Sequence, residues 1–161
     1  MNSIAQTCVT FVGANYGAHN KKNIDKSIIY STILALLLGI SLGGVILIFA
    51  NPLLNLYIDD LVSLEYGYSR LKIILLTYFL CGTMDVFALS LRALGCSLFP
   101  TIVSLLGVCG IRIFWTYTIF MIPEYHTLNS LILSYPISWV ITSIIHLITL
   151  LIVRKKLYKS M

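Results

Sequence analysis

The chain has 161 residues, of which 58% are hydrophobic and only 11% are charged. Soluble domains carry about 45–50% apolar and about 25% charged residues, and a chain of this size has too little interior to bury such an excess. Intrinsic disorder is excluded as well, because it requires low hydrophobicity and high charge. The composition therefore indicates an all-α integral membrane protein, with room for four or five spans of roughly 20 residues each.

Residues 1–18 have the character of a membrane span that begins before them. The segment is short, is interrupted by polar residues and lacks a basic start, so it does not fit a signal peptide. A basic stretch, residues 19–26, follows it. We expect residues 1–18 to form a partial span at the start of a fragment or of a truncated reading frame.

Four full spans are predicted after this partial one. The apolar runs that define them cover residues 27–50, 71–94, 101–120 and 130–153. Each is long enough to cross most of a hydrocarbon layer about 30 Å thick, at about 1.5 Å per residue. Asn51-Pro52 is expected to end the first of these helices. The small residues Gly39 and Gly43 predict a close helix–helix contact, which we expect within the chain rather than in a dimer.

The basic residues lie at the ends of apolar runs, which indicates membrane topology and not a surface for nucleic acid. One side of the predicted topology carries seven basic residues, with Arg92 nearby: Lys21, Lys22, Lys26, Arg154, Lys155, Lys156 and Lys159. The other side carries only Arg70 and Lys72, beside four acids. Because positive residues concentrate on the cytoplasmic side, residues 19–26 and 154–161 are expected to be cytoplasmic. The sequence thus predicts a multi-pass plasma-membrane protein with a cytoplasmic C-terminus.

Several motifs resemble those of the multidrug and toxic compound extrusion (MATE) transporters. Residues 10–18 (TFVGANYGA) are similar to the FVGQNYGA stretch that closes the family's eighth span, and residues 91–95 (LRALG) to the LRGxG at the end of the tenth. Residues 107–115 and 133–139 resemble segments of the eleventh and twelfth spans. Ala14 and Ala93 replace a Gln and a Gly of the family motifs. The resemblance implies a part of the C-terminal six-helix lobe, without the N-terminal lobe.

The resemblance implies a secondary active antiporter that exports drugs or organic cations in exchange for H⁺ or Na⁺. Its partners are then the lipid bilayer, small organic cations and the missing N-terminal lobe, and no cofactor other than the coupling ion is expected. Two alternatives remain open: a lipid or polysaccharide flippase of the same superfamily, and a non-transporting truncated membrane protein. The sequence holds no GxSxG, HExxH or GxxxxGK[ST] motif and no metal-ligand spacing of cysteines, so we expect neither an enzyme nor a metal site.

Asp85 is the one acid deep in a predicted span, which makes it the leading candidate for binding the coupling ion or a cationic substrate. A carboxylate there costs at least about 2.5 kcal/mol and should face water or a partner. A structural ion pair with Arg112 is the competing interpretation. The turn between their helices places the two residues within about three positions of the same depth, or roughly 4.5 Å.

Three further side chains near Asp85 are candidates for the site. Tyr78 and Phe87 flank it in sequence and would suit hydrophobic cations through cation–π contact, although ordinary helix packing explains them as well. Arg92 lies near the end of the same helix, where we prefer snorkelling to lipid headgroups over a role as a cytoplasmic gate. His146 is expected to be a hydrogen-bonded interior histidine rather than a proton relay.

Overall fold

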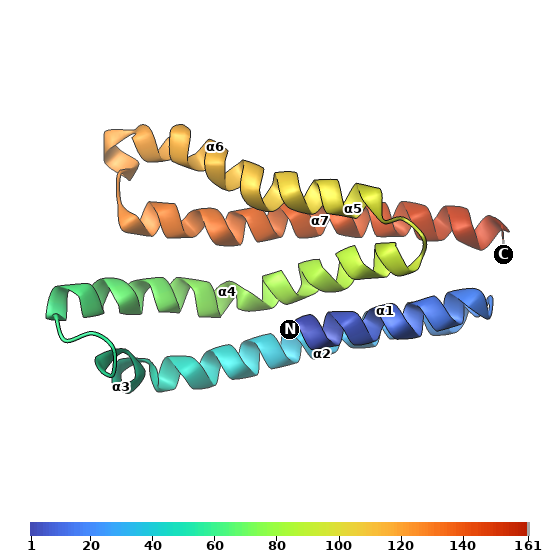
Figure 1. Cartoon of the computed structure of the whole chain (residues 1–161), viewed down its shortest axis with the longest axis horizontal. Helices are drawn as coiled ribbons and strands as arrows, with labels where there is room; N and C mark the ends of the chain where they lie inside the picture. Colours follow the sequence, from blue (N-terminus) through green and yellow to red (C-terminus); the bar gives the residue numbers. More distant parts are fainter. Residues whose placement is uncertain (161) are drawn as a thin grey trace.

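The computed structural model describes residues 1–160 and is almost entirely helical (Figure 1). Three long α-helices are α2 (Lys21–Ile48), α4 (Leu61–Ala93) and α7 (Leu128–Ser160), and a shorter one, α1 (Asn2–Gly17), precedes them. A further long helix consists of α5 (Leu98–Ser104), a π-helical segment (Leu105–Gly110) and α6 (Ile111–Tyr117). The short helix α3 (Ala50–Asn55) and the 3₁₀ turns Ile119–Met121 and Pro123–Tyr125 complete the chain. The predicted all-α fold is confirmed.

Within residues 1–160, four helical segments are long and apolar enough to cross a membrane, which confirms the predicted number of full spans. Their bounds are Lys21–Ile48, Leu61–Ala93, Leu98–Met121 and Leu128–Lys159. All four are longer than the apolar runs, by four to nine residues. The basic residues of stretch 19–26 mostly form the first turns of α2, and those of the tail continue α7. Hydropathy locates the part of a helix that lies in hydrocarbon, whereas the helix itself continues into the hydrated interface.

Helix α4 begins ten residues before the predicted span because a polar cap starts it. Asp60 Oδ2 accepts hydrogen bonds from the backbone N–H of Ser63 at 2.9 Å and from its hydroxyl at 2.7 Å. Such a bond satisfies one of the free N–H groups of a first turn. The hydroxyl bond and then the backbone bond hold the pKa of the Asp60 carboxyl below its usual value.

Two prolines lie in the first turns of helices, and a third lies inside a helix. Helix α2 ends at Ile48, and Pro52 is the third residue of the next helix, α3, so it does not itself end α2. In a first turn the missing N–H of proline leaves no intrahelical bond unmade. Pro100 occupies the same position in α5. Pro136 is buried inside α7.

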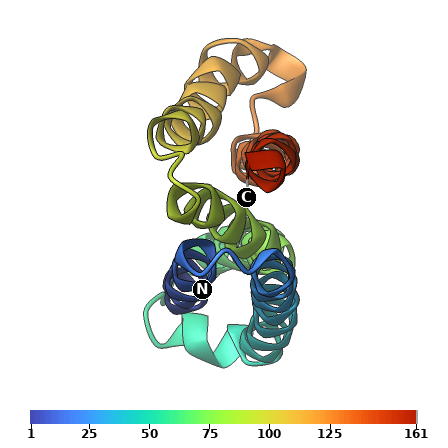
Figure 2. The same cartoon turned by 90° about the vertical axis from the view of Figure 1, so that its right-hand side faces the viewer.

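Helix α4 is the centre of the molecule. It packs against α1, α2 and α7, and Figure 2 shows it between the α1–α2 pair and the pair formed by α7 and the α5–α6 helix. The buried apolar residues that join these helices are Ala5, Cys8, Val12, Ile24, Ile28, Ala35, Val86, Leu91, Leu94 and Leu150. Because most other apolar side chains remain exposed, the packing suits a surface surrounded by lipid.

Two glycines mark a close approach of α2 to α4. A Cβ atom on Gly39 would lie 2.8 Å from the Cα of Phe79, and one on Gly43 would lie 2.8 Å from the carbonyl oxygen of Leu75. Only residues without a side chain allow the backbones to come so near. The predicted contact is confirmed as packing within the chain.

The two basic stretches meet at one end of the molecule, on the right in Figure 1. Lys21 Nζ donates to the carbonyl oxygen of Tyr158 at 2.7 Å, and the Tyr158 hydroxyl donates to Asp25 Oδ1 at 2.8 Å. Arg154 Nη1 forms an ion pair with the same carboxylate oxygen at 3.0 Å. We call Lys21, Asp25, Arg154 and Tyr158 the basic-end clasp, because they tie the start of α2 to the end of α7.

Removing the Tyr158 hydroxyl is expected to loosen the basic-end clasp. Tyr158→Phe keeps the ring but removes the donor to Asp25, which should cost about 1 kcal/mol. We expect faster amide hydrogen exchange over residues 21–28, measured by mass spectrometry on the detergent-solubilised protein. Tyr57→Phe is the matched control, since Tyr57 is 88% exposed after α3. Equal exchange in the two variants would contradict a holding role for the clasp.

Candidate functional site

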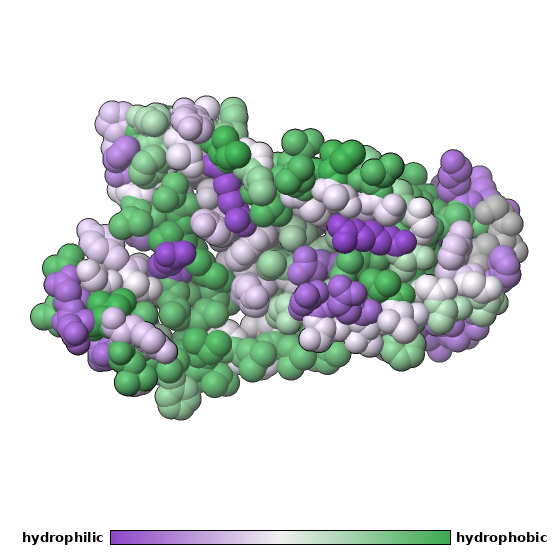
Figure 3. Space-filling view, in the orientation of Figure 1, coloured by the Kyte–Doolittle hydropathy of each residue, from purple (hydrophilic) through white to green (hydrophobic). Residues whose placement is uncertain are grey.

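The candidate site is a polar pocket of about 460 Å³ around Asp85. Its lining comes from three helices: Asn2 and Gln6 of α1, Met84, Asp85, Ala88, Leu89 and Arg92 of α4, and Ser104 of α5. Figure 3 shows hydrophilic side chains gathered between α1 and α5 on a face that is otherwise largely apolar or neutral. Carboxylate, amide and hydroxyl groups are thus collected in the part of the molecule that crosses the membrane.

The periodicity of α4 brings the α4 side of this pocket together. Asp85, Ala88, Leu89 and Arg92 are spaced by three, four and seven positions, so they share one helix face. The Asp85 side chain is half-buried, and no hydrogen bond or ion pair joins its carboxylate to another residue among residues 1–160. A structural carboxylate in a span should have such a partner, because an unpaired charge there is costly. The free carboxylate therefore suits a proton or a bound cation.

The ion pair between Asp85 and Arg112, the competing interpretation of Asp85, is not formed among residues 1–160. Arg112 Nε donates to Ser138 Oγ at 3.3 Å, and its guanidinium carbon lies 3.9 Å from the centre of the Tyr135 ring. Both partners belong to α7, whereas the pocket of Asp85 opens between α1 and α5. The side chains of the two residues therefore have different neighbours.

Arg92 lines the pocket of Asp85 and also joins α4 to α5. Its Nη2 donates to Thr101 Oγ1 at 3.2 Å. This contact spans the turn at Gly95, whose φ of 88° is readily adopted only by glycine. Snorkelling and gating by Arg92 both stay predictions.

Tyr78 and Phe87 do not form an aromatic wall around Asp85, and their positions agree with the alternative of ordinary helix packing. Phe87 lies two residues after Asp85, about 200° around the helix, and lines a separate groove with Leu147. Tyr78 packs edge-on against Trp139 of α7, with 6.3 Å between ring centroids, and does not line the pocket. Amide and hydroxyl groups take the place expected for aromatic rings.

A column of buried polar residues on α7 lies behind the pocket, and sequence reasoning missed it. Its members recur every four residues and are all buried: Ser130, Ser134, Ser138, Thr142 and His146. His146 Nε2 lies 3.0 Å from the hydroxyl oxygen of Ser104, which confirms the predicted interior hydrogen-bonded histidine. Because Ser104 also lines the pocket, the column is connected to the site of Asp85. The four-residue spacing of small polar side chains was the signal available in the sequence.

Loss of Arg112 is expected to weaken the contact between α6 and α7 without affecting Asp85. Arg112→Gln removes the bond to Ser138 and the stacking on Tyr135, for which we expect about 1–2 kcal/mol in thermal unfolding. In double-mutant cycles, Ser138→Ala should add little to the destabilisation caused by Arg112→Gln. The effects of Asp85→Asn and Arg112→Gln on stability should simply add. Strong coupling between the Asp85 and Arg112 variants would restore the ion-pair interpretation.

Comparison with known proteins gives three matches. The family model described as MatE matches residues 1–118. The "Probable multidrug resistance protein YoeA" of Bacillus subtilis (strain 168) is 29% identical over 76 residues, which cover 45% of this chain and 16% of that protein. A solved inward-facing multidrug resistance MATE family transporter of the MOP superfamily superposes with a TM-score of 0.81 at 20% identity, over 89% of this chain and 32% of that one. The chain therefore spans a third or less of the length of these relatives, and the structural likeness shows the fold.

Proposed function

Because the chain belongs to the MatE family, we propose that it forms part of the C-terminal lobe of a secondary active antiporter. The antiporter exports drugs or other organic cations in exchange for H⁺ or Na⁺. The unpaired carboxylate of Asp85, inside a polar pocket at the depth of the membrane, is the observation that carries this proposal. A carboxylate in that position attracts cations, and an exchanger of cations needs such a site.

The pocket has the chemistry that either coupling ion requires. A small hard cation such as Na⁺ is bound by several oxygen atoms, and the carboxylate of Asp85, the amides of Asn2 and Gln6 and the hydroxyl of Ser104 offer them. A proton needs only the carboxylate of Asp85. Since an organic cation competes for the same negative charge, ion and substrate exclude one another. Mutual exclusion at one site, combined with alternating access, produces exchange.

The proposal places the protein in the plasma membrane, with the basic end in the cytoplasm. Seven basic residues belong to the first turns of α2 and the last turns of α7, which meet at the basic-end clasp. The opposite end of the molecule carries α3 and the 3₁₀ turns, with the acids Asp59, Asp60 and Glu124. Positive residues mark the cytoplasmic side. The lipid bilayer and an N-terminal lobe are the partners that this placement requires.

Expression in two pieces tests the proposal. The chain is produced in pump-deficient bacteria, alone or together with a polypeptide that carries the preceding spans of a MATE transporter, and ethidium efflux is measured. We expect no efflux from the chain alone, because one lobe supplies only one wall of the central cavity, and efflux from the pair. Efflux from the chain alone, or no efflux from two pieces that purify together, would contradict the proposal.

A further inference from the structure

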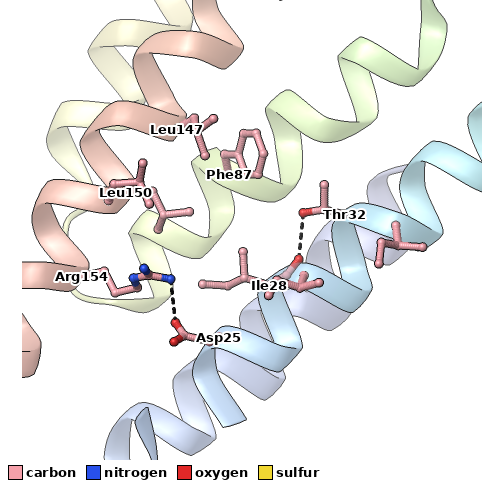
Figure 4. A pocket seen from close by; sticks show the side chains of 10 residues that line it. Asp25, Ile28, Thr32, Phe87, Leu147, Leu150 and Arg154 are labelled. Atoms are coloured by element: carbon pink, nitrogen blue, oxygen red, sulfur yellow. Dashed lines mark hydrogen bonds and ion pairs between the residues drawn. The ribbon is translucent and has the colours of Figure 1, made fainter. Parts of the chain in front are cut away.

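A groove of about 270 Å³ lies between α2, α4 and α7, on the side of α4 that faces away from Asp85. Figure 4 shows Phe87, Leu147 and Leu150 along it, with the ion pair of Asp25 and Arg154 at one end. The rest of its lining is aliphatic apart from one hydroxyl: Ile28, Ile29, Thr32, Ile33 and Leu151. The Thr32 hydroxyl donates to the carbonyl oxygen of Ile28 in its own helix. The groove is therefore apolar along its length and charged only at one end.

Both walls of the groove change from aliphatic residues to lysines in the same direction. On α2, Ile33 and Ile29 are followed toward the helix start by Lys26 and Lys22. These positions are three or four apart, so they lie on one helix face.

The wall on α7 has the same order. Leu147 and Leu151 are followed by Lys155 and Lys159, each four residues further on. Lys155 and Lys159 also line a shallow hollow of about 270 Å³ on the neighbouring face of α7, together with Ile152 and Lys156. The four lysines that continue the two walls are exposed.

The charge at this end is strongly positive after internal pairing. Residues 19–26 and 154–160 contain seven basic residues and one acid, Asp25. The carboxylate of Asp25 is already bound by Arg154 and Tyr158. Lys22, Lys26, Lys155 and Lys159 are thus available to an anion at the mouth of an apolar groove.

We propose that this groove binds an acyl chain of an anionic phospholipid, whose headgroup phosphate is held by the lysines at its end. The groove lies along membrane-spanning helices, so lipid chains have direct access to it. Basic residues beside a membrane surface each attract anionic lipids, and basic pockets between helices hold their headgroups. A hydrophobic cation would fit the aliphatic walls but would be repelled by the lysines.

Native mass spectrometry of the detergent-solubilised chain tests the proposal. The protein is mixed with phosphatidylglycerol or phosphatidylcholine that have the same acyl chains. We expect phosphatidylglycerol to be retained at least several-fold better. The Lys155→Gln/Lys159→Gln double variant should lose on the order of tenfold of that affinity. Lys72→Gln, at an exposed position of α4, is the charge control and should retain it.

A second pair of variants tests the groove itself. Leu147→Trp fills the groove and should abolish phosphatidylglycerol retention, whereas Ile148→Trp lies outside its lining and should not. Circular dichroism shows whether each variant keeps its helices. Equal retention of the two lipids, or retention by Leu147→Trp, would overturn the proposal. Displacement of the lipid by tetraphenylphosphonium would show that the groove binds a hydrophobic cation instead. A dimer that excludes lipid would show that a second copy of the chain covers the groove.

Discussion

Replacing Asp85 with asparagine is expected to reduce ion-coupled efflux by the assembled transporter roughly 100-fold, because the bound cation would lose its charged partner. The variant keeps the size and shape of the side chain but removes the charge that attracts the coupling ion and the substrate. Efflux is measured with ethidium in cells that contain the chain and the preceding spans, under an imposed H⁺ or Na⁺ gradient. The gradient that drives efflux in the unmodified protein identifies the coupling ion.

The same variant separates a transport role from a structural one. Asp85 has no ionic or hydrogen-bonding partner in residues 1–160, so Asp85→Asn leaves no other group unpaired. We therefore expect normal amounts of protein in the membrane and an unchanged unfolding temperature. Glu124→Gln, in the exposed turn after the third span, is the control for loss of an acidic residue and should transport normally. Loss of protein in Asp85→Asn would indicate a structural carboxylate.

Placing a methyl group on Gly43 is expected to destabilise the fold by about 1–3 kcal/mol, the usual cost of overpacking. A Cβ atom there would lie 2.8 Å from the Leu75 carbonyl oxygen, which belongs to a rigid helix and cannot move alone. Helices α2 and α4 must therefore separate in Gly43→Ala. Thermal unfolding of the purified chain in detergent measures the loss.

The next residue supplies the matched control. A Cβ atom on Gly44 meets nothing within 4 Å, so Gly44→Ala should leave stability unchanged or raise it by up to about 1 kcal/mol through higher helix propensity. Equal losses of stability in Gly43→Ala and Gly44→Ala would contradict the inference that the close contact of α2 with α4 requires a glycine at position 43.

The fold was largely predictable because the membrane imposes helices on long apolar runs. Four such runs in the sequence correspond to four long helices in the structure. The ends of the helices were not predictable from hydropathy. Helix α4 starts at the cap of Asp60, and α2 starts among lysines that are polar but still helical.

The π-helical segment Leu105–Gly110 also has no signal in the apolar pattern. Within it, Gly107 packs directly on Thr142, and a Cβ atom at that position would collide with the threonine hydroxyl. Such a segment depends on which helix lies opposite, which a single sequence does not specify.

The role of Asp85 in the candidate site stays a prediction, whereas two contacts considered for it are not formed. Asp85 was identified by the cost of an isolated carboxylate in a span, and the structure places it in a polar pocket. The competing pairing with Arg112 was based on depth alone, and the side chains of the two residues have different neighbours. Phe87 was assigned by its distance in sequence, although two residues on a helix point about 200° apart.

The most direct test of the whole account is the side of the membrane on which each end of the molecule lies. In a background with the four native cysteines replaced by alanine, single cysteines at Asn20 and Tyr125 are exposed to a membrane-impermeant maleimide in intact cells. We predict labelling at position 125 in intact cells and labelling at position 20 only after the cells are opened. Labelling at position 20 in intact cells would contradict a topology of four spans with the lysine-rich end in the cytoplasm. Labelling at neither position, even in opened cells that contain the protein, would contradict it as well.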